Sequence, residues 1–359
     1  MPGLRSIRLA LTVLLALCTA AFAGPRSEIK FGLFSTEAWE TMWPNWEQFL
    51  AAQSAALGVQ VTAYYAPTYG ALVDAMARNE VQIAWLGNKA AVEAVARANA
   101  EVFAQIAKKE GETDYDSQLI VHADSPLRSL EDVLKCGRSL DFGIGDPNST
   151  SGYLAPATYI FAAEGIDPQT CFKSVHTANH EANAVAVAGR KLDVATFNSD
   201  EMERLTVAKP AMVKQIRVIW SSPPLPLDPL VWRKDLDPSI KVKLCKFFLG
   251  YGRFGTAEEN TAARAVLSKL LWVPFHPSWN GQLLTVQILE ATKKLVAAPE
   301  ADREAAIAGV AKLAEQRTKA ASGIAQKLAD AFLVAERSGD RAGMSNIMET
   351  LAAGYAAMQ

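Results

Sequence analysis

The sequence predicts an α/β protein with two doubly wound lobes, two hinge crossings between them and a C-terminal helical extension. Strand and helix patterns alternate in two series between residues 28 and 220, as in sheets covered by helices. Extended runs near Ser117 and Ser222 are the expected crossing points between the two lobes. From about residue 301 the chain is rich in Ala, Glu and Lys, with apolar residues at helical spacing. With 359 residues, half of them hydrophobic, the chain is long enough for two cores.

The first residues have the pattern of an export signal. Two arginines are followed by an apolar run over residues 9–23, which is too short to span a bilayer. Small residues at Ala21 and Ala23 favour removal of residues 1–23 as a signal peptide. We therefore expect a periplasmic protein that is soluble after cleavage. A membrane anchor and a lipoprotein modified at Cys18 are the alternatives.

Lobe one is expected to comprise residues 24–116 and 226–290. Its first part alternates strands with helices, and two helices complete it after the chain returns from lobe two. Trp85, at the end of the third strand, is expected in the core. The expected strands cover residues 29–33, 59–65 and 81–85, and the expected helices cover residues 41–57, 69–79, 89–99, 238–251 and 258–271.

Lobe two is expected to comprise residues 117–225. It opens with an extended run and closes with a proline-rich stretch that stiffens the return to lobe one. The expected strands cover residues 117–122, 140–145, 172–177, 192–197 and 216–220, and the expected helices cover residues 129–134, 153–163, 183–189 and 201–208.

Residues 291–359 are expected to form a helical tail. Ile324, Leu328 and Phe332 lie four apart on one helical face. Such a stripe fits either a homodimer interface or packing of the tail back on lobe one, and the sequence leaves both open.

The cysteines predict one disulfide. Cleavage of the signal peptide leaves three of them, so one bridge at most can form. Cys136 and Cys171 each precede a lobe-two strand. If those two strands are neighbours, both cysteines lie at the same end of the sheet, away from the ligand. We therefore expect a Cys136–Cys171 disulfide and a free Cys245.

Residues 143–152 join a predicted strand to a predicted helix and are the most informative stretch of the chain. Ser149, Thr150 and Ser151 place three hydroxyls near the free N–H groups of a first helical turn, which attracts a phosphoryl-type anion. Gly152 permits close approach of the backbone. The same residue types also form ordinary helix N-caps, and that alternative stays open.

Other polar residues follow neighbouring strands, where ligands bind in open α/β sheets. His180, Asp200 and Asp228 lie on three such loops of the second series and the return, and Tyr69 and Tyr115 come from lobe one. A tyrosine hydroxyl can donate to an anion while its ring excludes solvent. Plainer roles are an exposed position for His180 and Tyr115, a helix cap for Asp200 and a turn residue for Asp228.

Five motifs in register extend the pattern over residues 28–275. They are Ala84-Trp85-Leu86-Gly87-Asn88, Gly145-Asp146-Pro147-Asn148-Ser149-Thr150-Ser151-Gly152, His180-Glu181-Ala182-Asn183-Ala184, Asp193-Val194-Ala195-Thr196 and Asp228-Pro229-Leu230-Val231-Trp232-Arg233-Lys234. Together they resemble the phosphonate-binding periplasmic proteins of ABC transporters. The resemblance implies a type II periplasmic binding fold and delivery of a phosphonate to an inner-membrane permease and its ATPase.

The resemblance also implies roles for the candidate site residues. Asp200 and Asp228 match the two acids that hold the amine of an aminoalkyl phosphonate, so 2-aminoethylphosphonate or a related alkylphosphonate is the expected ligand. The sequence departs from the pattern in having Asp rather than Glu at position 200, and in having Leu86 where an aromatic is common. The residues that match the phosphonate-holding set are Tyr69, Tyr115, Ser149, Thr150, Ser151 and His180.

Other functions are less consistent with the sequence. A net charge of −2 gives no field for nucleic acid. No Gly-x-Ser-x-Gly elbow of a hydrolase is present, so we expect no enzyme and no cofactor. His176 and His180 straddle a strand end and are not expected to bind a metal. A receptor for phosphite or another tetrahedral oxyanion and a sensor protein of the same fold remain alternatives.

Overall fold

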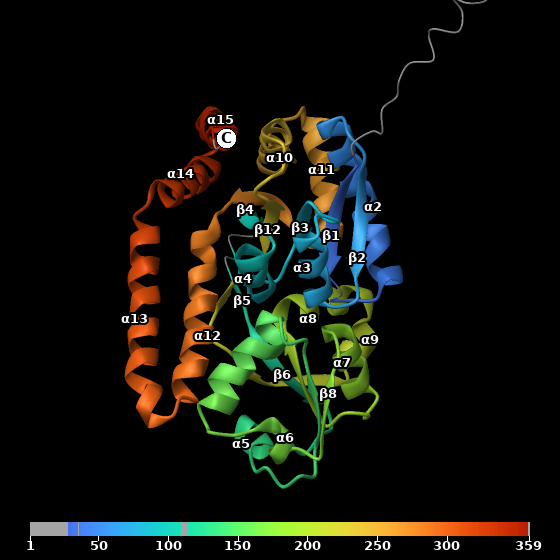
Figure 1. Ribbon diagram of the computed structural model, residues 1–359. Coiled ribbons are helices and arrows are strands. Elements are labelled where there is room, and N and C mark those ends of the chain that lie inside the picture. The colour runs from blue at the N-terminus through green and yellow to red at the C-terminus, as the bar shows by residue number, and fades with distance from the viewer. Residues whose placement is uncertain (1–27, 35, 109–111, 113, 358–359) are drawn as a thin grey trace, which may run out of the picture.

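The computed structural model describes residues 28–34, 36–108, 112 and 114–357 (Figure 1). The expected signal peptide, residues 1–23, lies outside the described residues. Two large sheets, each with helices on its faces, lie one beyond the other, and the C-terminal helices run along one side. None of the helices in the described part of the chain has the length and apolar character that a membrane span requires.

The first sheet has six strands in the order β13-β4-β12-β3-β1-β2. β1 is parallel to β2 and β3, whereas β12 runs antiparallel between β3 and β4. The sheet is therefore mixed, because β12 is formed by the chain on its return from the second sheet. The strands are β1 (Ile29–Phe34), β2 (Val61–Ala66), β3 (Ile83–Trp85), β4 (Ala100–Ala107), β12 (Pro229–Arg233) and β13 (Val273–Pro277).

Three of these strands, β4, β12 and β13, were not predicted. The sequence of β4, AEVFAQIA, contains three alanines and a glutamate, which favour helices. β12 begins with a proline and β13 contains two, and prolines usually indicate turns. Both strands obey the rule for proline, since β12 has it at its first residue and β13 lies at the sheet edge.

Helices cover the first sheet and enclose an aromatic core. Phe31 of β1 lies 5.4 Å from Trp46 and 6.4 Å from Phe248, measured between ring centroids. All three rings are buried, and each contributes about 1.5–3 kcal/mol to folding. The helices are α2 (Trp39–Leu57), α3 (Tyr69–Ala77), α4 (Asn88–Arg97), α10 (Pro238–Gly250) and α11 (Ala257–Lys269).

The second sheet has five strands in the order β10-β6-β9-β7-β8. β7 is parallel to β8 and β9, and β6 is antiparallel to β9 and β10. Two separate hydrophobic clusters fill the space between this sheet and its helices. The strands are β6 (Ser117–His122), β7 (Asp141–Ile144), β8 (Ser174–Thr177), β9 (Val194–Asn198) and β10 (Ile216–Ser221).

The helix after β7 begins earlier than expected and is wound mostly as a π-helix. It starts at Thr150 rather than Tyr153, and π geometry flanks Pro156, which has no N–H to donate. Its two π segments are η2 (Thr150–Leu154) and η3 (Ala157–Ala162). The other helices of this layer are α5 (Leu130–Val133), α6 (Pro168–Cys171), α7 (His180–Ala188), α8 (Ser199–Ala208) and α9 (Pro210–Val213).

The chain crosses between the two sheets through a small ribbon. β5 (Asp114–Tyr115) and β11 (Leu225–Pro226) pair antiparallel there. Beside them the Ser117 N–H donates to Ser222 Oγ at 3.0 Å, and the Ser222 N–H donates to the Ser117 carbonyl at 2.8 Å. The two sheets with their helices and the C-terminal helical region confirm the predicted fold class. The lobe boundaries expected at residues 116–117 and 225–226 stay a prediction.

Cys136 and Cys171 are joined by a disulfide, and Cys245 is a buried free thiol in α10. The pair is the one expected from the sequence. The premise of that expectation holds, because β7 and β8, the strands that follow the two cysteines, are parallel neighbours.

The C-terminal helices pack partly on the first sheet. Phe332 is fully buried in the first core and lies beneath the Arg253 guanidinium at 5.1 Å, whereas Ile324 is 78% exposed. The expected stripe is therefore split between core and surface. Phe332 packs back on lobe one, which is one of the two arrangements that the sequence left open. The helices are α12 (Leu284–Val296), α13 (Glu300–Ala321), α14 (Ile324–Ser338) and α15 (Arg341–Ala356), preceded by the short η4 (Asn280–Leu283).

Candidate ligand-binding site

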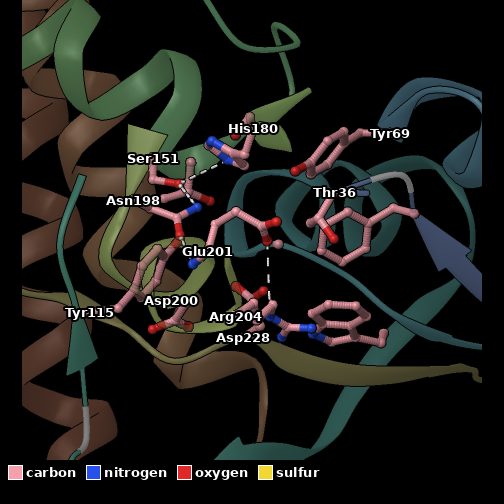
Figure 2. A pocket seen from close by; sticks show the side chains of 15 residues that line it. Thr36, Tyr69, Tyr115, Ser151, His180, Asn198, Asp200, Glu201, Arg204 and Asp228 are labelled. Atoms are coloured by element: carbon pink, nitrogen blue, oxygen red, sulfur yellow. Dashed lines mark hydrogen bonds and ion pairs between the residues drawn. The ribbon is translucent and has the colours of Figure 1, made fainter. Parts of the chain in front are cut away.

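One pocket between the two sheets brings all eight expected site residues together (Figure 2). Most of them lie at the carboxyl ends of strands or in the helices that follow, as ligand sites in α/β sheets do, whereas Tyr115 lies in β5 (Asp114–Tyr115) and Asp228 directly precedes β12. The pocket is lined by Tyr69, Tyr115, Ser149, Thr150, Ser151, His180, Asp200 and Asp228, together with Phe34, Thr36, Trp85, Gly87, Asn198, Glu201 and Arg204.

The three hydroxyls of the cradle, Ser149, Thr150 and Ser151, each accept a hydrogen bond from the protein. Ser149 Oγ accepts from the Gly152 N–H at 3.0 Å, Thr150 Oγ1 from the Lys89 N–H at 2.8 Å, and Ser151 Oγ from Asn198 Nδ2 at 3.1 Å. Since these oxygens act as acceptors towards the protein, their own protons are available to an anion. All three residues are buried.

Two glycines allow the strand end and the helix start to touch. The Gly145 N–H donates to the Gly152 carbonyl at 2.9 Å. A Cβ on Gly145 would lie 2.7 Å from Gly152 Cα, and one on Gly152 would lie 2.9 Å from Ser149 Oγ. This close approach fixes the first helical turn, whose N–H groups have no partners within the helix, beside the hydroxyls.

His180, Tyr69 and Tyr115 complete the neutral side of the pocket. Burial lowers the pKa of His180 to about 4, so the ring is uncharged at neutral pH. Its Nδ1 is buried without a hydrogen-bond partner among the described residues. Burial, followed by the nearby Asp228, raises the pKa of both phenols, which therefore keep their protons and can donate. Figure 2 shows the Tyr69 hydroxyl pointing towards His180.

Ser151 Oγ lies 3.5 Å from His180 Nε2, and these two side chains need to be distinguished from a hydrolytic pair. A histidine base needs a third group to orient its other ring nitrogen, and Nδ1 of His180 has none within the described part of the chain. The lowered pKa also makes the ring a poor base. The pair is suited to binding and not to nucleophilic catalysis.

The opposite side of the pocket is acidic. Burial, and then the neighbouring Asp200, raises the pKa of Asp228 well above its usual range. Burial also raises the pKa of Asp200, although Lys108 opposes this shift with an ion pair at 3.0 Å. Asp228 Oδ1 accepts a long hydrogen bond of 3.5 Å from Asn88 Nδ2. A cationic group of a ligand would stabilise the ionised forms of these acids.

Glu201 and Arg204 line the pocket but were not identified from the sequence. Both lie on α8, one and four residues after Asp200, a spacing that puts Asp200 and Arg204 on one helical face. The Arg204 guanidinium lies 5.3 Å above the Trp85 ring, 3.6 Å from Glu37 and 4.0 Å from Glu201. Trp85 is 2% exposed, as expected of a core residue, and also forms part of the pocket wall.

Contacts outside the pocket also join the two sides. The Ala38 N–H donates to Glu181 Oε2 at 2.9 Å, and the Glu181 N–H donates to the Thr36 carbonyl at 3.3 Å. Lys209 forms an ion pair with the same Glu181 carboxylate. Two α/β layers that meet over one polar, anion-adapted pocket define the class of two-lobed solute-binding proteins.

Comparison with known proteins identifies the family. Residues 31–279 match the periplasmic substrate-binding proteins of phosphonate ABC transporters, and the chain belongs to this family. It is 44% identical over 267 residues to the phosphonates-binding periplasmic protein of Escherichia coli (strain K12), which covers 74% of this chain and 77% of that protein. The resemblance inferred from the five motifs is confirmed. The chain is thus the phosphonate-binding component of an ABC transporter, which acts with a permease and an ATPase and is not an enzyme.

Solved structures show the same fold. A binding protein component of an ABC phosphonate transporter from Pseudomonas aeruginosa is 42% identical, with a TM-score of 0.78 over 82% of this chain and 99% of that chain. PhnD1 of Prochlorococcus marinus (strain MIT 9301), described as a probable phosphite-binding protein, is 22% identical over 206 residues, 56% of this chain and 68% of that protein. Its structure with methylphosphonate has a TM-score of 0.63 at 19% identity, over 73% of this chain and 96% of that chain.

Proposed function

We propose that the chain captures an aminoalkylphosphonate, with 2-aminoethylphosphonate as the first candidate, and delivers it to the permease. One observation carries this proposal: the pocket has uncharged hydrogen-bond donors on one side and buried carboxyl groups on the other. A phosphonate alone would bring only negative charge towards those carboxyl groups. A ligand that also carries an ammonium group satisfies both sides through charge-assisted hydrogen bonds.

The proposed ligand lies across the pocket. Its phosphonate oxygens accept from the Ser149, Thr150 and Ser151 hydroxyls and from the first N–H groups of the helix, with further donors supplied by His180, Tyr69 and Tyr115. Its ammonium group meets the acidic side, where Asp200, Glu201 and Asp228 are the available carboxyl groups.

A receptor for phosphite or a simple alkylphosphonate is the second candidate. The ion pair between Lys108 and Asp200 favours it, because an acid that is already paired exerts less demand for a cation from the ligand.

Thermal unfolding of the mature protein with a panel of ligands separates these candidates. The panel is phosphite, phosphate, sulfate, methylphosphonate, propylphosphonate and 2-aminoethylphosphonate, each at the same concentration. A ligand at about 100 times its Kd adds about 2.7 kcal/mol to the unfolding free energy. We expect the largest shift with 2-aminoethylphosphonate. A larger shift with phosphite or methylphosphonate would support the second candidate.

We further propose that the protein is exported with cleavage after residue 23 and forms a homodimer through its C-terminal helices. α13 has no buried residue among those described, and Ile307 and Ile324 are 53% and 78% exposed. Light scattering tests the dimer: Ile307→Glu combined with Ile324→Glu should give a monomer. Deletion of the tail is a poorer test, since it would remove Phe332 from the core. An unchanged mass for the double variant would exclude this interface.

A further inference from the structure

Glu201 is the least satisfied acid in the pocket. The residue is 2% exposed, and its Oε1 is buried with no hydrogen-bond partner in the described part of the chain. Its backbone N–H donates to Asn198 Oδ1 at 2.7 Å, which fixes the start of α8. Figure 2 shows the Glu201 carboxylate in the middle of the labelled side chains, between Thr36 and Arg204. Thr36 Oγ1 is also buried, with no hydrogen-bond partner among the residues that the structure describes.

Asp200, the adjacent residue, is in the opposite situation. Its Oδ1 lies 3.0 Å from Lys108 Nζ, which also contacts Glu203 at 2.9 Å and Glu112 at 3.2 Å. Lys108 directly follows β4 of the first sheet, and Asp200 is the second residue of α8 in the second layer. Asp200 therefore forms a direct ion pair with a protein cation, although Lys108 is shared with Glu203 and Glu112, and the pair joins the two lobes.

Acidic groups outnumber basic groups around Glu201. Arg204 lies 3.6 Å from Glu37 and 4.0 Å from Glu201, and Lys209 pairs with Glu181. Three acids thus share two bases on this side of the pocket. Burial, and then the charge of Glu37, raises the pKa of Glu201 well above its usual range, which is the expected response of a buried carboxyl group whose nearest cation is 4.0 Å away and shared with another acid.

We propose that Glu201, together with Asp228, receives the ammonium group of the ligand, and that Asp200 serves as the partner of Lys108. This inference rests on the proposed aminoalkylphosphonate function. Glu201 belongs to the second layer and Asp228 precedes β12 of the first, so one ammonium group between them joins both lobes. Glu201 is then a determinant of specificity for the amine.

The test compares two ligands of the same shape by calorimetry. In propylphosphonate a methyl group replaces the ammonium group of 2-aminoethylphosphonate. The ratio of the two affinities therefore measures the contribution of the ammonium group to binding. We expect Glu201→Gln to reduce this ratio at least tenfold and to change the affinity for propylphosphonate less than threefold. Asp200→Asn should weaken both ligands alike, because it breaks the Lys108 contact between the lobes. Glu203→Gln, a half-exposed neighbour on α8, is the matched control and should keep the wild-type ratio.

Proton release provides a second readout that does not depend on affinity. Binding of 2-aminoethylphosphonate, measured by calorimetry in two buffers of different ionisation enthalpy, should release fewer protons from Glu201→Gln than from the wild type at the same pH. Equal release would contradict the role of Glu201.

The outcomes distinguish this inference from the proposed function. If the wild type binds both ligands equally, the aminoalkyl function is wrong and the inference falls with it. If the wild type prefers the amine and Glu201→Gln keeps that preference while Asp200→Asn abolishes it, the function stands and the inference is wrong. If Glu201→Gln bound both ligands more tightly and by the same factor, the inference would also be overturned, since Glu201 would then only repel the anionic phosphonate.

Discussion

The two sides of the pocket use different physical means to bind a ligand. On the cradle side, the three short hydroxyls lie within about one turn of chain and are fixed by backbone and amide donors, and His180 is neutral. On the acidic side, long or charged side chains depend on one another: Arg204 is shared by Glu37 and Glu201, and Lys108 holds Asp200. On the function proposed above, the cradle would supply affinity for any phosphonate, whereas the acidic side would select what the phosphonate carries.

The largest expected effect comes from removing the cradle hydroxyls. Ser149→Ala with Thr150→Ala deletes two donors to an anionic group, each worth roughly 1.5–3 kcal/mol. We expect binding of 2-aminoethylphosphonate and propylphosphonate to weaken equally, by about 3–6 kcal/mol, in calorimetry. Ser268→Ala with Thr318→Ala, two exposed helical positions, is the control. Wild-type affinity in the cradle variant would show that the anion lies elsewhere.

A second effect separates the stability of lobe two from the geometry of the cradle. The disulfide closes a loop of 35 residues at the end of the β7–β8 pair opposite the cradle. Cys136→Ala with Cys171→Ala should lower the unfolding free energy by about 3–4 kcal/mol in the chain-entropy model. Denaturant unfolding measures this loss, and ligand affinity at low temperature should stay within twofold.

The control for this prediction is the buried free thiol. Cys245→Ala should leave the response of the protein to a reducing agent unchanged, whereas the double variant should no longer respond. If the double variant also loses affinity for the ligand, the geometry of the cradle depends on the disulfide, and the two properties are not separate as predicted.

How far the sequence predicts this site differs between its two sides. The cradle is contiguous: Ser149, Thr150 and Ser151 stand at one strand–helix junction, so their convergence needs only local structure. Glu201 was missed because its role depends on contacts made by residues distant in sequence. Lys108 pairs with Asp200 from 92 residues away, and Glu37 contacts Arg204 across the pocket. No spacing along the chain indicates which of two adjacent acids forms the closer ion pair.

The same distinction holds for the fold. Strands with regular patterns, such as β1 and β9, and most of the helices were predicted from local periodicity. β4 and β12 were missed because their composition favours a helix or a turn, and pairing with distant strands overrides that preference. The split of the C-terminal stripe also depends on tertiary contacts, since the burial of Phe332 follows from Arg253 and the core beneath it.

A third effect is confined to the acidic side. Asp228→Asn removes a carboxyl group that the ammonium needs but leaves the cradle intact. We expect 2-aminoethylphosphonate to bind at least tenfold more weakly, about 1.4 kcal/mol, with little change for propylphosphonate. Calorimetry with both ligands measures the difference. Equal weakening of the two would show that the sides of the pocket do not act separately.

The smallest expected effect is the dependence of amine selectivity on pH. Asp228 and Glu201 have raised pKa values in the empty pocket, so at mildly acidic pH part of the population holds protons there. An ammonium group lowers these pKa values, so binding releases protons and strengthens as pH rises. The affinity ratio of 2-aminoethylphosphonate to propylphosphonate should therefore increase between pH 5.5 and 7.5, by about fivefold or roughly 1 kcal/mol.

Three features make this measurement specific to the acidic side. His180, with its pKa lowered to about 4, stays neutral throughout the range. The ligand amine, like that of lysine, stays charged. The ammonium group lowers the second phosphonate pKa of 2-aminoethylphosphonate below that of propylphosphonate, but this ligand contribution to the ratio is the same for the wild type and for Glu201→Gln, so comparing the two proteins removes it. Glu201→Gln should flatten the pH dependence, since it removes one of the two titrating carboxyl groups. A ratio that falls with pH in the wild type would mean that the ammonium group does not lie among these acids, and the division of labour between the two sides would have to be abandoned.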